Sequence, residues 1–327
     1  MSHPSRRTTL AALAALPLVV PEAVRAQAWP SRPIRLIVSY PAGGVSDIVA
    51  RALGDRIAGR LGQPVVIENR AGASGTIGMD AVAKAVPDGH TIGFSAISPL
   101  VLTPHLGPTP FDPQHDIAPV ASVMYSPVLL LGTSALGSTR DFRGAIALAR
   151  VQPGAVRWAT SGQASVGHIM LEQVEATAGV KITHVPYKGG GQQMNDALSG
   201  QFEILSTNAG PTVSQYIKAG KLVPLAVGAP VRLASLPDVP TLAELGYGAA
   251  NSSSFFGVFA PSRTPAAVVR RLNAEINRAL AEPALRKQLL DSDNVPATGT
   301  PADFARQIVA ESASNANIIR AAGIKAG

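Results

Sequence analysis

Short apolar runs alternate with stretches of helical periodicity along most of the chain. The apolar runs are rich in Val, Ile and Leu, which is typical of buried strands. We expect strands at residues 34–39, 65–68, 91–95, 128–132, 156–159, 182–185, 202–206, 222–227 and 256–260. We expect helices at residues 47–60, 77–85, 141–150, 167–178, 192–199, 211–219, 265–280, 283–290 and 301–322. Because strands and helices alternate, the sequence predicts an α/β protein with mainly parallel sheets.

One junction between a strand and a helix is more informative than the others. Residues 34–47 read IRLIVSYPAGGVSD, so an apolar strand stops at Pro41 and the chain turns at Gly43 and Gly44. Glycine lets the backbone approach a ligand closely, and the helix that follows presents unpaired N–H groups and the positive end of its dipole. The sequence therefore predicts an anion-binding loop. Taken alone, a simple Gly-Gly turn without a ligand fits it equally well.

The first 28 residues have the three parts of an export signal. Arg6 and Arg7 are followed by an apolar core at residues 10–20 and by the small-residue cleavage motif at residues 26–28. The core is too short to span a membrane, which takes about 20 apolar residues. The arginine pair resembles a twin-arginine signal, but Thr9 stands where an aromatic residue is usual, so general secretion remains an alternative. We expect cleavage after Ala28 and export of the remaining chain.

Composition limits the classes of protein that fit. Removing 28 of the 327 residues leaves 299, enough for one large domain or two lobes with a sizeable core. The chain is 46% hydrophobic and 15% charged, as expected of a folded soluble protein. Its formal charge of +7 falls to about +5 without the signal, a mild excess that favours anionic partners. No basic run interleaved with aromatic residues supports nucleic-acid binding.

The sequence gives no support for a metal or a cofactor. It has no cysteine, which excludes disulfides, thiolate metal sites, cysteine catalysis and a cysteine-linked lipid anchor. Its six histidines are not spaced with acidic residues as metal ligands are. We therefore expect neither a metal nor a cofactor.

Several stretches, taken in order, resemble the solute-binding proteins of tripartite tricarboxylate transporters, also called the Bug family. Each motif alone is weak, but the ordered series covers nearly the whole exported chain. Two examples are PAGGVSD at residues 41–47 and HVPYKG at residues 184–189. The full set lies at residues 29–38, 41–47, 61–70, 85–90, 111–113, 184–189, 219–226, 236–244 and 271–277.

The resemblance implies a periplasmic binding protein of type II. Two α/β lobes would flank a cleft and be joined by two crossover strands, near residues 128–133 and 255–261, that act as a hinge. Lobe 1 would comprise residues 29–126 and 254–327, and lobe 2 residues 127–253. The protein would capture a small carboxylate in the cleft and deliver it to membrane transporter subunits, as a periplasmic monomer that binds no nucleic acid. The identity of the carboxylate stays open.

The resemblance also implies the residues of the site. In the first βα loop, the residues expected to hold a carboxylate are Tyr40, Pro41, Ala42, Gly43, Gly44, Val45, Ser46 and Asp47. A carboxylate at Asp47 would repel an anion, so we expect it to cap the new helix or to hold a bridging water.

A second loop, in lobe 2, would close on the solute from the opposite side. Its expected site residues are Ser161, Gly162, Gln163, Ala164, Ser165 and His168. Further candidates follow other strands of both lobes: Ser95, Ser98, Lys188, Gly189, Thr207 and Asn208. Family members commonly carry Gly and Thr in place of Ala164 and Ser165, and Asp near Thr207. For His168 we favour local packing over contact with the solute.

Two other functions fit less well. Residues 163–167, QASVG, approach the nucleophile elbow of an α/β hydrolase but lack its first glycine. Such an enzyme would use Ser165 with His168 or His184. Alternatively, the closed protein would dock on a membrane receptor kinase as a ligand sensor. At the second crossover we expect Phe255 to pack in the hinge rather than to cover the solute.

Overall fold

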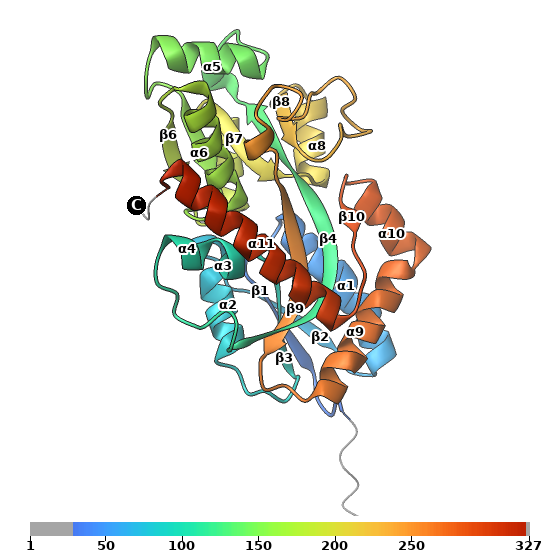
Figure 1. The fold of residues 1–327 in the computed structure, drawn as a ribbon. Coiled ribbons are helices and arrows are strands. Elements are labelled where there is room, and N and C mark those ends of the chain that lie inside the picture. Colours follow the sequence, from blue (N-terminus) through green and yellow to red (C-terminus); the bar gives the residue numbers. More distant parts are fainter. Residues whose placement is uncertain (1–28, 325–327) are drawn as a thin grey trace, which may run out of the picture.

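The structure is a computed structural model, and it describes residues 29–324. The predicted export signal at residues 1–28 lies outside this range. Figure 1 shows two α/β lobes, one above the other, connected by the long strands β4 (Ile117–Gly132) and β9 (Ser253–Pro261). Within residues 29–324, none of the helices has the length and apolar character of a membrane span.

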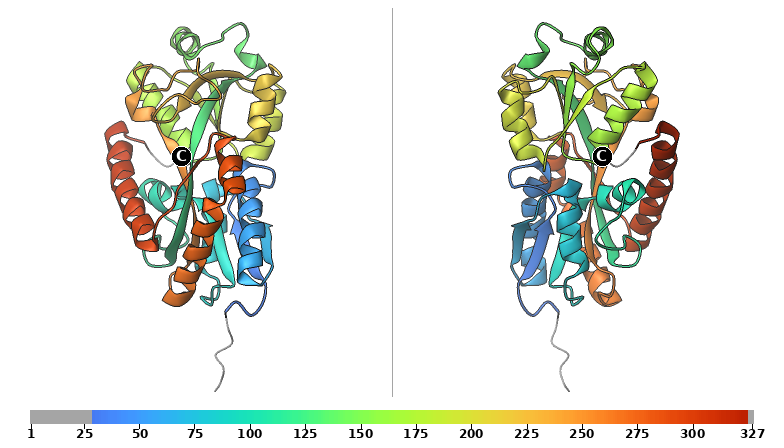
Figure 2. Two further views of the ribbon diagram at one scale, coloured as in Figure 1. Left: turned by 90° about the vertical axis from the view of Figure 1, so that its right-hand side faces the viewer. Right: turned by 90° about the vertical axis from the view of Figure 1, so that its left-hand side faces the viewer.

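The lower lobe is built around three parallel strands in the order β2-β1-β3, which continue into β9 and β4. Its strands are β1 (Ile34–Val38), β2 (Val65–Asn69), β3 (Thr91–Ala96) and the short β10 (Val295–Pro296). Its helices are α1 (Val45–Leu61), α2 (Thr76–Ala83), α3 (Ser98–Val101), α4 (Thr103–Leu106), α9 (Ala266–Ala281), α10 (Pro283–Leu290) and α11 (Pro301–Ala322). The side views place α11 on one side of the strands and α1 with α9 on the other (Figure 2).

The upper lobe repeats this plan on the second half of β4. Its other strands are β5 (Arg157–Thr160), β6 (Thr183–Pro186), β7 (Ile204–Asn208) and β8 (Val223–Gly228). Its helices are α5 (Phe142–Val151), α6 (Val166–Ala178), α7 (Gly190–Leu198) and α8 (Pro211–Lys218). Strands β5, β6 and β7 run parallel, whereas β4 pairs antiparallel with β7 and β8.

Alternation of side chains explains how helices cover both faces of the strands. In β1, Leu36 belongs to the core that packs against α1 and α9, whereas Ile37 belongs to the core on the α2 and α11 face. In the upper lobe, Leu130 and Leu131 of β4 likewise enter two different cores. Successive residues of a strand point to opposite faces, so a continuous apolar run fills both.

The expectation of mainly parallel sheets is wrong, because the sheet is mixed. The long strands β4 and β9 pair antiparallel with each other and with their neighbours β3 and β7. The crossover at Val128 also begins earlier than predicted, since β4 already starts at Ile117. Pro119 and Pro127 lie in this part of β4, where proline cannot donate to the strand ladder. The structure accommodates Pro119 beside a shift in the β4–β9 register.

Candidate functional site

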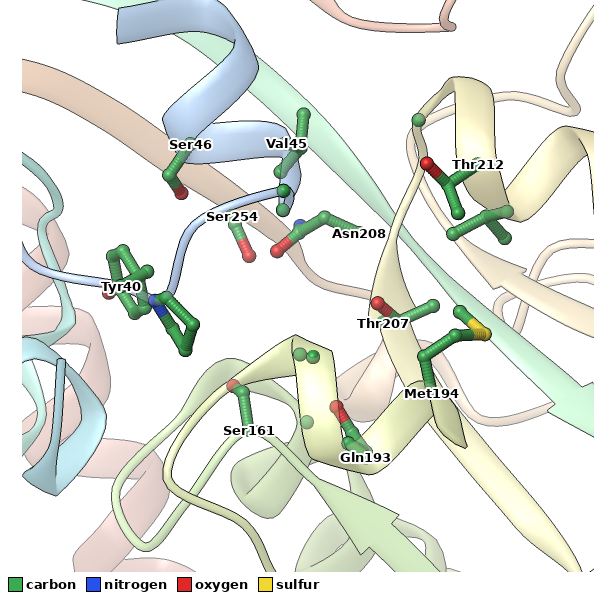
Figure 3. A pocket seen from close by; sticks show the side chains of 18 of the residues that line it. Tyr40, Val45, Ser46, Ser161, Gln193, Met194, Thr207, Asn208, Thr212 and Ser254 are labelled. Atoms are coloured by element: carbon green, nitrogen blue, oxygen red, sulfur yellow. The ribbon is translucent and has the colours of Figure 1, made fainter. Parts of the chain in front are cut away.

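A cavity of about 350 Å³ lies between the two lobes. It is lined by the loops that precede α1, α6 and α8, by the first turns of α7 and α8, and by the crossover strands β4 and β9. At about 30 Å³ for each water-sized group, it has room for roughly twelve such groups. The cavity is therefore of the size that binds small metabolites. Figure 3 shows the hydroxyl groups of Ser161, Thr207 and Ser254 around this space.

The first βα loop brings backbone N–H groups to the cavity. Gly43 has a φ of +81°, a conformation that favours glycine, and Gly44 precedes the first turn of α1 without offering a side-chain cap. Among the described residues, nothing accepts a hydrogen bond from the N–H of Gly44, Val45 or Ser46. These donors, at the positive end of a long helix, suit an anion.

Asp47 does not take part in this anion site. Its carboxylate instead holds the loop in place through hydrogen bonds. One carboxylate oxygen accepts hydrogen bonds from the Gly43 N–H (3.0 Å) and from Arg51 Nε (3.1 Å). The other accepts one from Asn69 Nδ2 (3.0 Å) and pairs with Arg51 Nη2 (2.9 Å). The expectation that Asp47 caps the helix is wrong, because its carboxylate accepts from the N–H of Gly43, which precedes the cap residue Gly44, and not from the first N–H groups within the helix.

The pKa of the Asp47 carboxyl shows how strongly its ionised form is held. Burial acts to raise this pKa, but the hydrogen bonds from Arg51, Gly43 and Asn69 and the Arg51 charge outweigh it and lower the pKa. The negative charge of Asp47 is therefore matched by its own partners and does not face the cavity uncompensated.

In the second loop, the Ser165 hydroxyl caps α6. It accepts a hydrogen bond from the His168 N–H (3.3 Å), and Ala164 before it has a φ of +58°. The His168 ring is engaged elsewhere: Nδ1 accepts from the Ala164 N–H (3.3 Å), and Nε2 lies 3.5 Å from Glu172. No hydrogen bond between the Ser165 hydroxyl and a histidine ring occurs in the described structure, so the pair that a serine hydrolase needs is not assembled.

Two stacked histidines, His168 and His184, contact this loop and help to fix its conformation. The rings of His168 and His184 lie 4.4 Å apart, and His184 Nε2 is 2.7 Å from the Thr160 hydroxyl. Thr160 in turn donates to the carbonyl of Gly162 (3.1 Å). Burial, followed by the charge of His168, lowers the pKa of His184 to about 4, while Glu172 opposes the shift. His184 is therefore a neutral structural partner of the loop at pH 7.

The structure brings many of the predicted site residues to the cavity, but not all of them. Those that line it are Tyr40, Pro41, Ala42, Gly43, Gly44, Val45, Ser46, Ser98, Ser161, Ser165, Thr207 and Asn208. Those that do not are Asp47, Ser95, Gly162, Gln163, Ala164, His168, Lys188 and Gly189.

Several of the other predicted residues have different environments. Ser95 is buried within β3, and Lys188 is exposed to solvent. Gly189 packs against Pro41 of the opposite lobe, where a Cβ would lie 2.3 Å from the Pro41 ring. Phe255 packs in the hinge, stacked on Tyr125 at 4.4 Å.

Sequence reasoning pointed to the glycine-bearing segments before α7 and α8, including Gly190 and Gly210, but missed the side chains of the helices themselves. The missed residues include Gly191, Gln193, Met194, Thr212 and Tyr216. The signal was present, because in both cases glycine follows a strand and precedes a helix, as in the first loop. Ser74, from the segment before α2, and Phe256, from a crossover strand, also line the cavity and had no such signal.

The electrostatic character of the cavity comes from the backbone. No Asp, Glu, Lys, Arg or His is among the described residues that line it. Helices α1, α6, α7 and α8 all begin at its wall, and each start leaves N–H groups without a partner inside the helix. The sum of these partial charges makes the site favourable for anions without any cationic side chain.

Two α/β lobes around a cavity, joined by paired crossover strands (Figure 1), define a solute-binding protein of the periplasmic type. Residues 49–324 match the tripartite tricarboxylate transporter family receptor, TctC. The chain is 36% identical to Protein BugT of Bordetella pertussis over 305 residues, which are 92% of this chain and 93% of BugT. The chain therefore belongs to the TctC receptor family.

Solved structures agree with this assignment. The periplasmic binding protein BugD has a TM-score of 0.85 and 28% identity, covering 91% of this chain and 99% of BugD. R. palustris Rpa4515 with adipate has a TM-score of 0.86 and 32% identity, covering 91% of this chain and 99% of Rpa4515.

Proposed function

We propose that the protein captures a small carboxylate between its lobes and delivers it to membrane transporter subunits. The observation that carries the proposal is the convergence of four helix starts on one cavity without a charged side chain among the described lining. Adipate in Rpa4515, a relative of closely similar fold, supports the same chemistry.

The strength of such a site is sufficient for a receptor. A hydrogen bond to a charged group contributes roughly 1.5–3 kcal/mol, whereas micromolar affinity requires about 8 kcal/mol. The N–H groups of Gly44, Val45 and Ser46 and hydroxyls such as that of Ser161 can supply several such bonds. Their summed free energy reaches this level after the cost of ordering the complex is subtracted. The proposed receptor performs no chemistry on its solute. In this proposal the Ser165 hydroxyl caps α6 and is not a nucleophile.

The proposal is tested by thermal unfolding of residues 29–327 against a set of carboxylates that includes adipate, with adipamide as the uncharged control. A ligand at one hundred times its Kd adds about 2.7 kcal/mol to the unfolding free energy. We expect stabilisation by at least one acid and none by its amide. Indifference to every acid would contradict the proposal.

A Gly44 variant links any stabilisation to the first loop. Gly44 has an extended φ of −78°, and a Cβ there meets only the Pro41 carbonyl oxygen at 3.6 Å, so Gly44→Val fits the backbone and places bulk beside the N–H groups. We expect it to abolish the stabilisation by acids. Gly59→Ala in the same helix, where a Cβ has open space, is the control and keeps it.

We further propose the compartment and organisation that such a receptor requires. The chain would be exported, cleaved after Ala28 and active in the periplasm as a monomer. Lobe 1 would comprise residues 29–126 and 254–327, and lobe 2 residues 127–253, with the hinge at the crossover strands. Mass spectrometry of the periplasmic protein tests the cleavage site, and light scattering tests the monomer.

A further inference from the structure

The loop between β2 and α2 has an unusual backbone. Four successive residues have positive φ angles: Gly72 (+134°), Ala73 (+46°), Ser74 (+52°) and Gly75 (+99°). Glycine adopts such angles freely, but the Cβ atoms of Ala73 and Ser74 make them unfavourable. A conformation of this kind persists where the surrounding contacts enforce it, and such positions cluster at functional sites.

The contact that accompanies this conformation crosses from one lobe to the other. The Ser74 hydroxyl donates a hydrogen bond to the carbonyl of Gln163 in the second solute loop, and Ser74 is only 3% exposed. Tyr40, in the first solute loop, donates to the Ser74 carbonyl at 3.3 Å. The packing is close, because a Cβ on Gly162 would lie 2.6 Å from the Ser74 hydroxyl oxygen.

This hydrogen bond fixes the peptide group between Gln163 and Ala164. Its carbonyl is held by Ser74, and its N–H, which belongs to Ala164, donates to His168 Nδ1 at 3.3 Å. Both polar groups of the peptide are therefore committed, and the loop that carries Ser161 and Ser165 to the cavity has a defined shape. Ser74 belongs to one lobe and the peptide to the other, so the arrangement exists only when the lobes are together.

We propose that Ser74 is a positioning residue that latches the closed form and slows solute release. The proposal rests on the function proposed above, because it assumes that the lobes open and close around a solute. Opening at the crossover strands separates Ser74 from Gln163 and returns both groups to water. The bond therefore adds to the stability of the closed form alone, and any change in that stability changes the apparent affinity for solute.

Ser74→Gly removes the hydroxyl and relieves the unfavourable φ, so the variant keeps the fold. Because Ser74 also lines the cavity, the latch is separated from direct solute contact by a measurement made without solute. Ser74→Ala removes the hydroxyl without that relief and serves as the second variant. We expect adipate to bind about tenfold more weakly to both, the loss of one hydrogen bond to a buried carbonyl. The loss should appear in a faster dissociation rate, with the association rate unchanged within twofold, and Ser74→Gly should unfold at or above the wild-type temperature.

A second measurement reports the latch without any solute. The chain has no native cysteine, so Val66→Cys and Val151→Cys introduce two exposed labelling sites, one on each lobe. Distances between labels, measured by single-molecule energy transfer, give the closed fraction of the unliganded protein. We expect Ser74→Gly to lower the ratio of closed to open molecules about tenfold.

An unchanged closed fraction and an unchanged dissociation rate in Ser74→Gly would overturn the latch. So would a faster dissociation with an unchanged closed fraction, since that would mean that Ser74 contacts the bound solute directly. If wild-type protein binds no acid while Ser74→Gly still lowers its closed fraction, the latch stands and the proposed function fails. The two failures are therefore distinguishable.

Discussion

Replacing Asp47 with Ala should destabilise the protein through the loop that it holds, although Asp47 does not line the cavity. The carboxylate is 5% exposed and receives hydrogen bonds from Gly43, Arg51 and Asn69. Three bonds to a charged group would sum to roughly 5–9 kcal/mol. Water replaces part of this, because the Arg51 side chain is 50% exposed. We therefore expect a loss of about 2–4 kcal/mol, or roughly 4–8 °C in Tm for a chain of this size.

The effect should depend on pH in a specific direction. The pKa of Asp47 is lowered in the folded protein, so its stabilisation is complete above the ordinary value of 3.8 and is lost as the pH falls through the folded pKa. Thermal unfolding of wild type and Asp47→Ala should therefore differ fully at pH 7, and the difference should shrink progressively as the pH falls below 3.8. Asp55→Ala, an exposed aspartate of the same helix, is the control and should change Tm by less than about 1 °C.

Two results would refute this reasoning. Equal Tm values for Asp47→Ala and Asp55→Ala at pH 7 would show that the hydrogen bonds contribute no net stability. A difference that does not shrink at all as the pH falls below 3.8 would show that the effect comes from packing and not from the ionised carboxylate. Asp47→Asn, which keeps the volume without the charge, should fall between wild type and Asp47→Ala.

Two further predictions test other parts of the structure. His184 has a pKa of about 4 instead of 6.5, so folding favours its neutral form. Stability is therefore lost as the pH falls from 6.5 to 4, by about 3 kcal/mol. His184→Gln should flatten this part of the Tm profile, and a profile parallel to that of the wild type would contradict the prediction. Gly257→Ala places a Cβ 2.2 Å from the Phe304 ring and 2.7 Å from the Ala121 carbonyl, so it should cost about 1–3 kcal/mol or more, whereas Gly59→Ala, in open space within α1, should add about 0.5–1 kcal/mol. Chemical denaturation compares the two glycine variants, and equal midpoints would show that the crossover tolerates the added methyl group.

Hydrophobic periodicity predicted most of the helices and strands because both lobes bury continuous apolar runs. It failed where other residues interrupt the run. Pro119 and Pro127 interrupt the apolar pattern in the first part of β4, so that part was not predicted. The helices α3 and α4 are too short to show helical periodicity. The mixed character of the sheet also escaped prediction, because the direction in which β9 pairs with β4 is not encoded in either strand alone.

The part of the site formed by a single local sequence pattern could be predicted. The Gly43–Gly44 turn before α1 needs only the strand, the glycines and the helix that follows them. The role of Asp47 could not be read in the same way, because Asp47 lies in α1 and its partner Asn69 lies at the end of β2. Ser74 gave no signal at all, since a serine with positive φ has no distinctive sequence and its partner Gln163 belongs to the other lobe. Contacts of this kind depend on the tertiary fold.

The central claim is that backbone N–H groups of the first loop bind a carboxylate, and amide NMR tests it directly. Uniformly ¹⁵N-labelled protein would be titrated with the acid that stabilises it most in the thermal screen. We predict saturable shifts of the Gly44, Val45 and Ser46 amide resonances, with little change at Gly62 and Gly179, which end helices. Saturable binding that leaves the first-loop amides unmoved would contradict the account.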